Sequence, residues 1–128
     1  MSDSSIMRVM WTVSDPLGNR IQLSRRCWEH HILVEHPIMR QFSNQARTTV
    51  QRPDLIFRSK VSATALLHFK QYSRRPIGRF YLMVVAGIRK TRRRGFVKTA
   101  FLVYNLTKGG IALWEKSSGI RTTLKVTS

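Results

Sequence analysis

The sequence is poor in acidic residues, in cysteine and in long apolar runs, and each shortage excludes a class of protein. It has six Asp and Glu residues against 23 Lys and Arg, a formal net charge of +17. So few carboxylates argue against two-metal phosphodiester chemistry, because Asp and Glu hold those ions. The single cysteine, Cys27, excludes an internal disulfide and cannot alone make a zinc site. This cysteine usage fits a reducing compartment.

Membrane-spanning, secreted and multidomain proteins are also disfavoured. No apolar run approaches the ~20 residues needed to cross a bilayer. The segment MSDSSIMRVMW lacks the basic and apolar regions of a signal peptide, so we expect a cytoplasmic protein. There are no repeats, low-complexity segments or Pro/Gly/Ser linkers, and 42% of the residues are apolar. These features predict one globular domain over residues 1–128.

The positive charge is concentrated in the second half of the chain. Residues 1–64 carry a net charge of +4 and residues 65–128 a net charge of +13. Such a field attracts polyanions, of which nucleic acid and an anionic membrane are the two alternatives. Membrane binding usually involves a basic amphipathic helix, whereas the densest cluster here, RKTRRR, lies in a predicted hairpin loop. We therefore favour nucleic acid.

Hydrophobic periodicity divides the chain into an N-terminal helical part and a strand-rich remainder. Short strands are expected at 6–13 and 21–24, joined by the turn SDPLGNR. Ser24 is a good N-cap for a helix ending at Pro37, and a second helix then runs to Pro53. The expected later strands are residues 55–59, 65–72, 79–88 and 95–104, with an optional edge strand at 120–126 before a loose end. This order predicts an α+β fold with helices on one face of an antiparallel sheet.

Several short motifs follow one another over about residues 18–115. They are His31-Ile32, His36-Pro37, Pro53-Asp54-Leu55-Ile56 with Ser59, Leu67-His68-Phe69-Lys70, Tyr81-Leu82-Met83-Val84-Val85, and Thr99-Ala100-Phe101. In this order and spacing the chain resembles the phage-associated branch of the barnase–EndoU–colicin–RelE-like (BECR) nuclease superfamily. The resemblance implies two N-terminal helices packed on a mostly antiparallel four-stranded sheet. It also implies metal-independent RNA cleavage without a cofactor, by a toxin or mobile-element effector of a bacterial or phage-infected cell.

Cleavage of RNA by its own 2′-OH needs a base, an acid and cations that stabilise the charge on the phosphorane. Histidine suits both proton transfers because its unperturbed pKa is about 6.5. The candidate catalytic residues are His31, His36, His68 and Thr99.

Each candidate also has a structural interpretation. His31 shares a helix face with Trp28 and Ile32, so it is either a core residue or a catalytic base or acid. His36 could instead cap a helix end. A metal site formed by His30, His31 and His36 is disfavoured, because their spacing spreads them around the helix.

Alternation along the strand at 65–72 places His68, Lys70 and Tyr72 on one face. That face either lines the groove, supplying an acid, a phosphate clamp and a stacking platform, or is an ordinary solvated face. In the strand at 95–104, alternation groups Val97 with Thr99. Thr99 either orients a phosphate or makes a local hydrogen bond.

The loop RKTRRRG concentrates five positive charges that repel one another, so it is either a solvated loop or a finger that grips an RNA backbone. The candidate RNA- and phosphate-binding residues are Lys70, Tyr72, Arg79, Arg89, Lys90, Arg92, Arg93, Arg94 and Lys98.

The sequence therefore predicts a metal-independent endoribonuclease that leaves a 2′,3′-cyclic phosphate, with an acidic antitoxin or immunity protein as its partner. The alternative is a non-catalytic basic RNA- or DNA-binding protein, since charge favours binding and not turnover. A third possibility, an interaction module for acidic proteins or lipid surfaces, lacks an exposed apolar helix.

Overall fold

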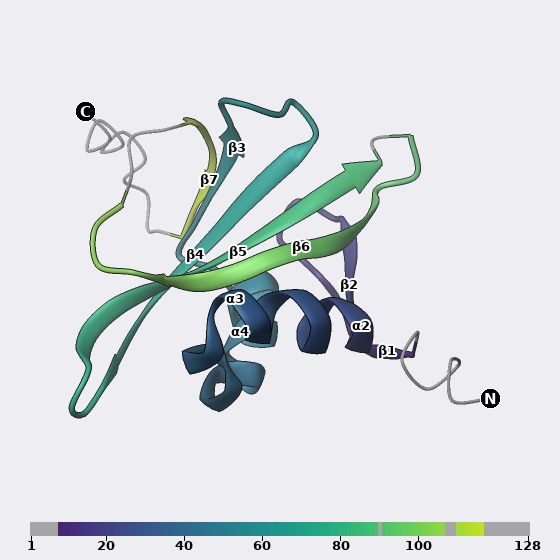
Figure 1. Cartoon of the computed structure of the whole chain (residues 1–128). Helices are drawn as coiled ribbons and strands as arrows, with labels where there is room; N and C mark the ends of the chain where they lie inside the picture. The colour runs from purple at the N-terminus through teal and green to yellow at the C-terminus, as the bar shows by residue number, and fades with distance from the viewer. Residues whose placement is uncertain (1–7, 90, 107–109, 117–128) are drawn as a thin grey trace.

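The computed structural model describes residues 8–89, 91–106 and 110–116, which form one seven-stranded sheet with helical segments on one face (Figure 1). Across the sheet the strands follow the order β1-β2-β6-β5-β4-β3-β7. Their bounds are β1 Val9–Ser14, β2 Arg20–Ser24, β3 Leu55–Ser59, β4 Ala65–Arg74, β5 Gly78–Arg89, β6 Arg94–Val103 and β7 Gly110–Glu115. Among the strands of the described residues, β2 and β6 pair in parallel and every other neighbouring pair is antiparallel.

Two short helical segments follow β2 and pack against the sheet. The first comprises α2 (Arg25–Cys27), the π-helical turn η1 (Trp28–Ile32) and α3 (Leu33–Glu35). It begins as predicted, because the Ser24 side chain accepts a hydrogen bond of 3.0 Å from the Cys27 backbone N–H. The second comprises the 3-10 turn η2 (Pro37–Phe42) and α4 (Ser43–Gln51). In the described ranges, no helix has the length and apolarity needed to cross a membrane.

The hydrophobic residues of the sheet divide between its two faces. Fully buried side chains such as Ile32, Phe42, Phe80 and Leu82 fill the space between helices and sheet. The opposite, outer face carries a smaller cluster around Phe57, Phe69 and Met83. Its remaining apolar side chains, among them Tyr81 and Phe101, are only partly buried. The helix-facing side therefore holds the main core, and the outer face keeps accessible surface.

The predicted four-stranded antiparallel sheet is wrong, because three further strands join a mixed seven-stranded sheet. The N-terminal hairpin of β1 and β2 extends the sheet beyond β6, and β7 pairs antiparallel with β3 at the other edge. The β2–β6 and β3–β7 pairings join segments far apart in sequence, and such pairings leave no local pattern in the sequence. The β5–β6 hairpin is present as predicted. The edge strand suggested at 120–126 lies outside the described residues.

A bulge in β6 explains a second difference from the alternation pattern. Val97 pairs with Ala86 and Thr99 with Val85, so Lys98 is an extra residue in the ladder. Val97 therefore joins the core on the helix side, whereas Thr99 lies on the outer face. The predicted grouping of Val97 with Thr99 is wrong for this reason.

Gly95 lies in the β5–β6 hairpin at a position with no room for a side chain. A Cβ atom at this position would lie 2.4 Å from Ile88 Cδ1 and 2.5 Å from the Gly87 carbonyl oxygen. We expect Gly95→Ala to lower the free energy of unfolding by about 1–3 kcal/mol, because the backbone must shift. Gly87→Ala is the matched control, since its Cβ would meet mainly the flexible end of Lys98 at 3.4 Å. Urea denaturation of both variants checks this, and equal midpoints would contradict it.

Candidate nucleic-acid interface

Three arginines stand in one row across neighbouring strands at the end of the sheet. In the ladders, Arg94 of β6 is paired with Arg20 of β2 on one side and with Arg89 of β5 on the other. Neighbouring strands are about 4.8 Å apart, so this register holds three guanidinium-bearing residues side by side. All three side chains are exposed. Like charges placed directly opposite one another destabilise a sheet.

A second row lies two residues further along the same face. Gln22 pairs with Phe96, and Phe96 pairs with Gly87. Thr12 of β1 pairs with Gln22 and extends the row to the sheet edge. Residues two apart on a strand share a face, so this polar and aromatic row borders the arginine row at a distance of about 6.6 Å along the strands.

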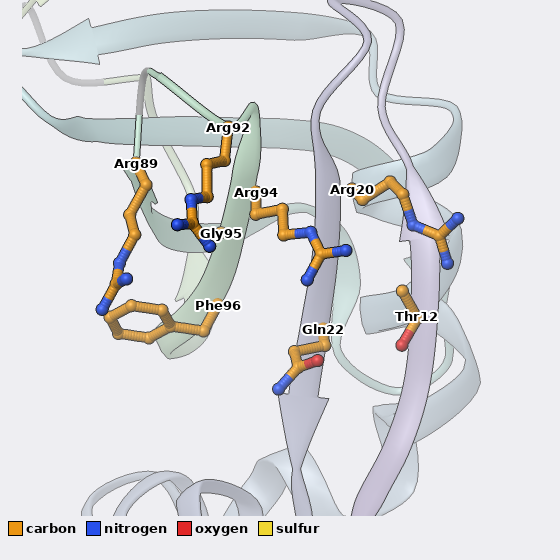
Figure 2. Close-up of a pocket in the computed structure, with 8 residues that line it drawn as sticks. All are labelled: Thr12, Arg20, Gln22, Arg89, Arg92, Arg94, Gly95 and Phe96. Carbon is orange, nitrogen blue, oxygen red and sulfur yellow. The ribbon is translucent and has the colours of Figure 1, made fainter.

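The two rows line a recess of about 320 Å³, here called the arginine recess. Its lining residues are Thr12, Arg20, Gln22, Arg89, Arg92, Arg94, Gly95 and Phe96. Figure 2 shows the Arg89 and Arg92 side chains reaching toward the side where the Phe96 ring lies, and the Arg94 guanidinium above the Gln22 carboxamide. Arg20 reaches across β1 beside Thr12.

No carboxylate in the described part of the chain lies within ion-pair distance of the four recess arginines. Four carboxylates of the described residues lie close to other basic side chains instead: Glu29 to Arg25, Glu35 to His31, Asp15 to His68, and Asp54 to Lys70 and Lys116. The recess is therefore a concentration of positive charge that the described residues leave uncompensated, and an anion entering it would relieve the repulsion.

A second recess, the histidine recess, adjoins the first. It has a volume of about 610 Å³ and shares Gln22 and Phe96 with the arginine recess. Its other lining residues are Ser24, Arg26, Cys27, His30, His31 and Val97. The His31 side chain is 46% exposed, and its Nε2 atom lies 3.8 Å from Glu35 Oε1. Of the predicted catalytic residues, His31 is the one that the structure places beside the arginine recess.

Cys27 lies in the wall of the histidine recess but is not an activated nucleophile. Its thiol donates a hydrogen bond to the Val97 carbonyl over 3.3 Å. Burial raises the pKa of the Cys27 thiol, which disfavours the reactive thiolate.

The prediction that His68 lines the groove is wrong, because its side chain has no exposed surface. It points to the helix side of β4, where the β1–β2 turn covers it. Its Nε2 atom donates a hydrogen bond of 2.9 Å to Asp15 Oδ2, and the Asp15 side chain is equally buried. Its other ring nitrogen, Nδ1, has no hydrogen-bond partner among the described residues. A phosphodiester cannot reach this imidazole, so the role of His68 is structural.

The buried pair of Asp15 and His68 fixes the β1–β2 turn, and this turn binds Arg93, which lies just before β6. Asp15 Oδ1 also accepts hydrogen bonds from the backbone N–H groups of Leu17, at 3.0 Å, and Asn19, at 2.9 Å. The Leu17 carbonyl in turn accepts a hydrogen bond from the Arg93 guanidinium. Arg93 therefore ties the β5–β6 hairpin to the turn and is not among the residues that line the arginine recess.

Lys70 and Tyr72 face the helix side and are used by the fold. Lys70 lies 3.6 Å from Asp54, and the Tyr72 hydroxyl donates a 3.0 Å hydrogen bond to the Gln45 carbonyl of α4. Burial raises the pKa of Tyr72. Arg79 is exposed at the opposite end of β5, ten residues or roughly 33 Å from Arg89. The structure does not bring these three predicted contacts to the arginine recess.

Three further predicted residues, His36, Thr99 and Lys98, lie on β6 or against it. His36 stacks on Phe101 with ring centroids 4.8 Å apart, away from the arginine loop. Thr99 Oγ1 is buried and has no hydrogen-bond partner among the described residues. Lys98 is exposed on the bulge and lies over Gly87 beside Phe96. Lys90 lies outside the described residues.

Sequence reasoning missed Arg20, Gln22 and Phe96. The alternating pattern of residues 20–24 gave a usable signal, because it places Arg20 and Gln22 together on the solvent side of their strand. It does not reveal the parallel partner that sets Arg20 beside Arg94. Phe96 lies within an apolar strand segment that gives no sign of its exposure, yet the residue is 49% exposed.

Comparison with known proteins adds no relatives: no family model matches the chain, and neither does any curated protein or solved structure. The motif resemblance to BECR nucleases therefore stays a prediction.

The buried Asp15–His68 pair makes stability depend on pH. Burial alone would raise the pKa of the Asp15 carboxyl, but hydrogen bonds from His68 and Asn19 outweigh it and lower the pKa below its ordinary value. A carboxyl with a lowered folded-state pKa stabilises the fold above its unfolded pKa of about 3.9, and this contribution is lost as pH falls through the folded value.

We expect Asp15→Ala to lower the free energy of unfolding by about 1–3 kcal/mol at pH 7, because it leaves the buried His68 ring without its hydrogen-bond partner. The difference from the unsubstituted protein should narrow below about pH 4. Urea denaturation between pH 7 and pH 3 measures both effects. Glu29→Ala is the control, because it breaks an exposed carboxylate pair with Arg25. Equal losses in the two variants would contradict a structural role for the buried pair.

Proposed function

We propose that the protein binds RNA through the arginine recess. The observation that supports this most directly is the register that aligns Arg20, Arg94 and Arg89 across three strands with no carboxylate partner among the described residues. Arginine suits phosphate binding because its planar guanidinium donates two parallel hydrogen bonds. The choice of RNA over DNA rests on the motif resemblance.

Binding of this kind is dominated by the release of counterions from the phosphates. The affinity should therefore fall steeply as salt rises, and every arginine that contacts a phosphate contributes to the slope. Contacts to phosphates position the nucleic acid but do not select its sequence. An acidic antitoxin or immunity protein would compete for the same surface.

The double substitution Arg20→Gln/Arg94→Gln should weaken RNA binding and reduce the slope of log K against log salt by about 1.4, at roughly 0.7 per lost phosphate contact on a single strand. Fluorescence anisotropy with labelled RNA at several salt concentrations measures this. Arg47→Gln/Arg52→Gln removes the same net charge from exposed positions in and just after α4. If both double variants lose affinity equally, the net charge and not the recess is responsible.

The second candidate function is RNA cleavage, and His31 supports it. His31 lines the recess that adjoins the arginines, with the Glu35 carboxylate 3.8 Å from its ring nitrogen. The Glu35 carboxylate lies beyond hydrogen-bond distance but close enough to attract the positive charge that forms on a general base when it accepts a proton. His31 would take the 2′-OH proton as the 2′-oxygen bonds to phosphorus and the bond from phosphorus to the 5′-oxygen breaks. Water would protonate the leaving 5′-oxygen, and arginines of the adjoining recess would hold the reacting phosphate.

Cleavage predicts that the protein cuts RNA in EDTA and leaves 2′,3′-cyclic phosphate ends. His31→Ala should reduce the rate at least 100-fold and Glu35→Gln less, because general acid–base catalysis contributes about 10²- to 10⁴-fold. RNA affinity should survive both substitutions. Analysis of product ends together with anisotropy separates the two functions. RNA binding without cleavage would remove the catalytic assignment and leave the binding function.

A further inference from the structure

We propose that the arginine recess selects single-stranded RNA, with one base stacked on the Phe96 ring. This inference rests on the proposed RNA binding and specifies the form of its ligand. Phe96 lies on the boundary between the two recesses and lines both. A strand that passes from one recess to the other therefore crosses this ring.

Phe96 is an aromatic residue on the outer, solvent-facing side of β6. Its sequence neighbours, Gly95 and Val97, point the other way and are buried, whereas Phe96 is 49% exposed. An apolar ring of this size usually gains stability from burial. Phe96 instead stands beside four arginines that keep the surface charged and hydrated. A half-exposed ring within a cationic surface is typical of sites that stack nucleic-acid bases.

The residue opposite Phe96 in the ladder is Gly87, which has no side chain that could cover the ring. A Cβ atom at Gly87 would lie 3.6 Å from Phe96 Cζ and 3.4 Å from Lys98 Cε. The ring edge and the Lys98 side chain therefore lie together over this glycine, with an added cation beside the stacking surface.

The two rows of residues match the two parts of a nucleotide. The arginine row offers donors for phosphates, and the row of Thr12, Gln22 and Phe96 offers neutral polar groups and an aromatic surface for a base. In a duplex the base faces are covered by stacking, so a ring cannot reach them. Only an unpaired nucleotide can use both rows at once.

The test compares a labelled single-stranded RNA with the same sequence in a duplex, by anisotropy at fixed salt. Phe96→Leu should weaken binding to the single strand roughly 5- to 100-fold, the range seen when one base stack is lost. Binding to the duplex and the salt slope should not change, since the arginines remain. Phe96→Tyr should retain affinity for the single strand because it keeps an aromatic ring.

Tyr104→Leu is the matched control, since Tyr104 is another exposed aromatic residue, at 64%, outside both recesses. Urea denaturation confirms that each variant is folded. Equal binding of Phe96→Leu and Tyr104→Leu to the single strand would overturn the stacking proposal, as would equal affinity of the unsubstituted protein for both RNA forms. In those cases the Arg20→Gln/Arg94→Gln variant still decides whether the recess binds RNA. Absence of any RNA binding would instead overturn the proposed function itself.

Discussion

The parallel pairing of β2 with β6 is the constraint on which the rest of the structure depends. It spans three residue pairs and places Arg20 beside Arg94 and Gln22 beside Phe96. Without this pairing, the β5–β6 hairpin would stand alone, and both recesses would lack the residues that β2 contributes to them. The pairing is held from the side by the β1–β2 turn, which the buried Asp15–His68 hydrogen bond fixes to β4. A histidine in the core thus supports a cationic site that it never contacts.

The row of aligned arginines that is proposed to bind RNA also lowers the stability of the fold. Aligned arginines repel one another, and the fold compensates with a well-filled core, including Phe42, Phe80 and Leu82, on the other side of the sheet. Functional sites commonly break local rules of stability in this way and rely on compensation elsewhere. The outer face carries the unfavourable charge, and the helix-facing side supplies the apolar burial that tolerates it.

Local patterns predicted the parts of this fold that local physics determines. Ser24 caps its helix, Pro37 begins the next segment, and the β5–β6 hairpin pairs as its apolar strands and basic turn suggested. The patterns failed where distant segments meet. The strand partners of β2 and β7 carry no local signal, and the Lys98 bulge reverses the alternation by one residue. His68 shows the same limit. Its polar side chain predicted an accessible position, whereas the turn that carries Asp15 buries it.

The distance in sequence between β2 and β6 also bears on how the chain folds. Residues 20–22 pair with residues 94–96, so this strand pair closes a long loop. Closing a long loop costs entropy, and we expect the pair to form more slowly than the helices. During synthesis the first strands leave the ribosome long before their partner exists. The arginine row is therefore complete only after these distant strands have paired, because that pairing alone sets Arg20 beside Arg94.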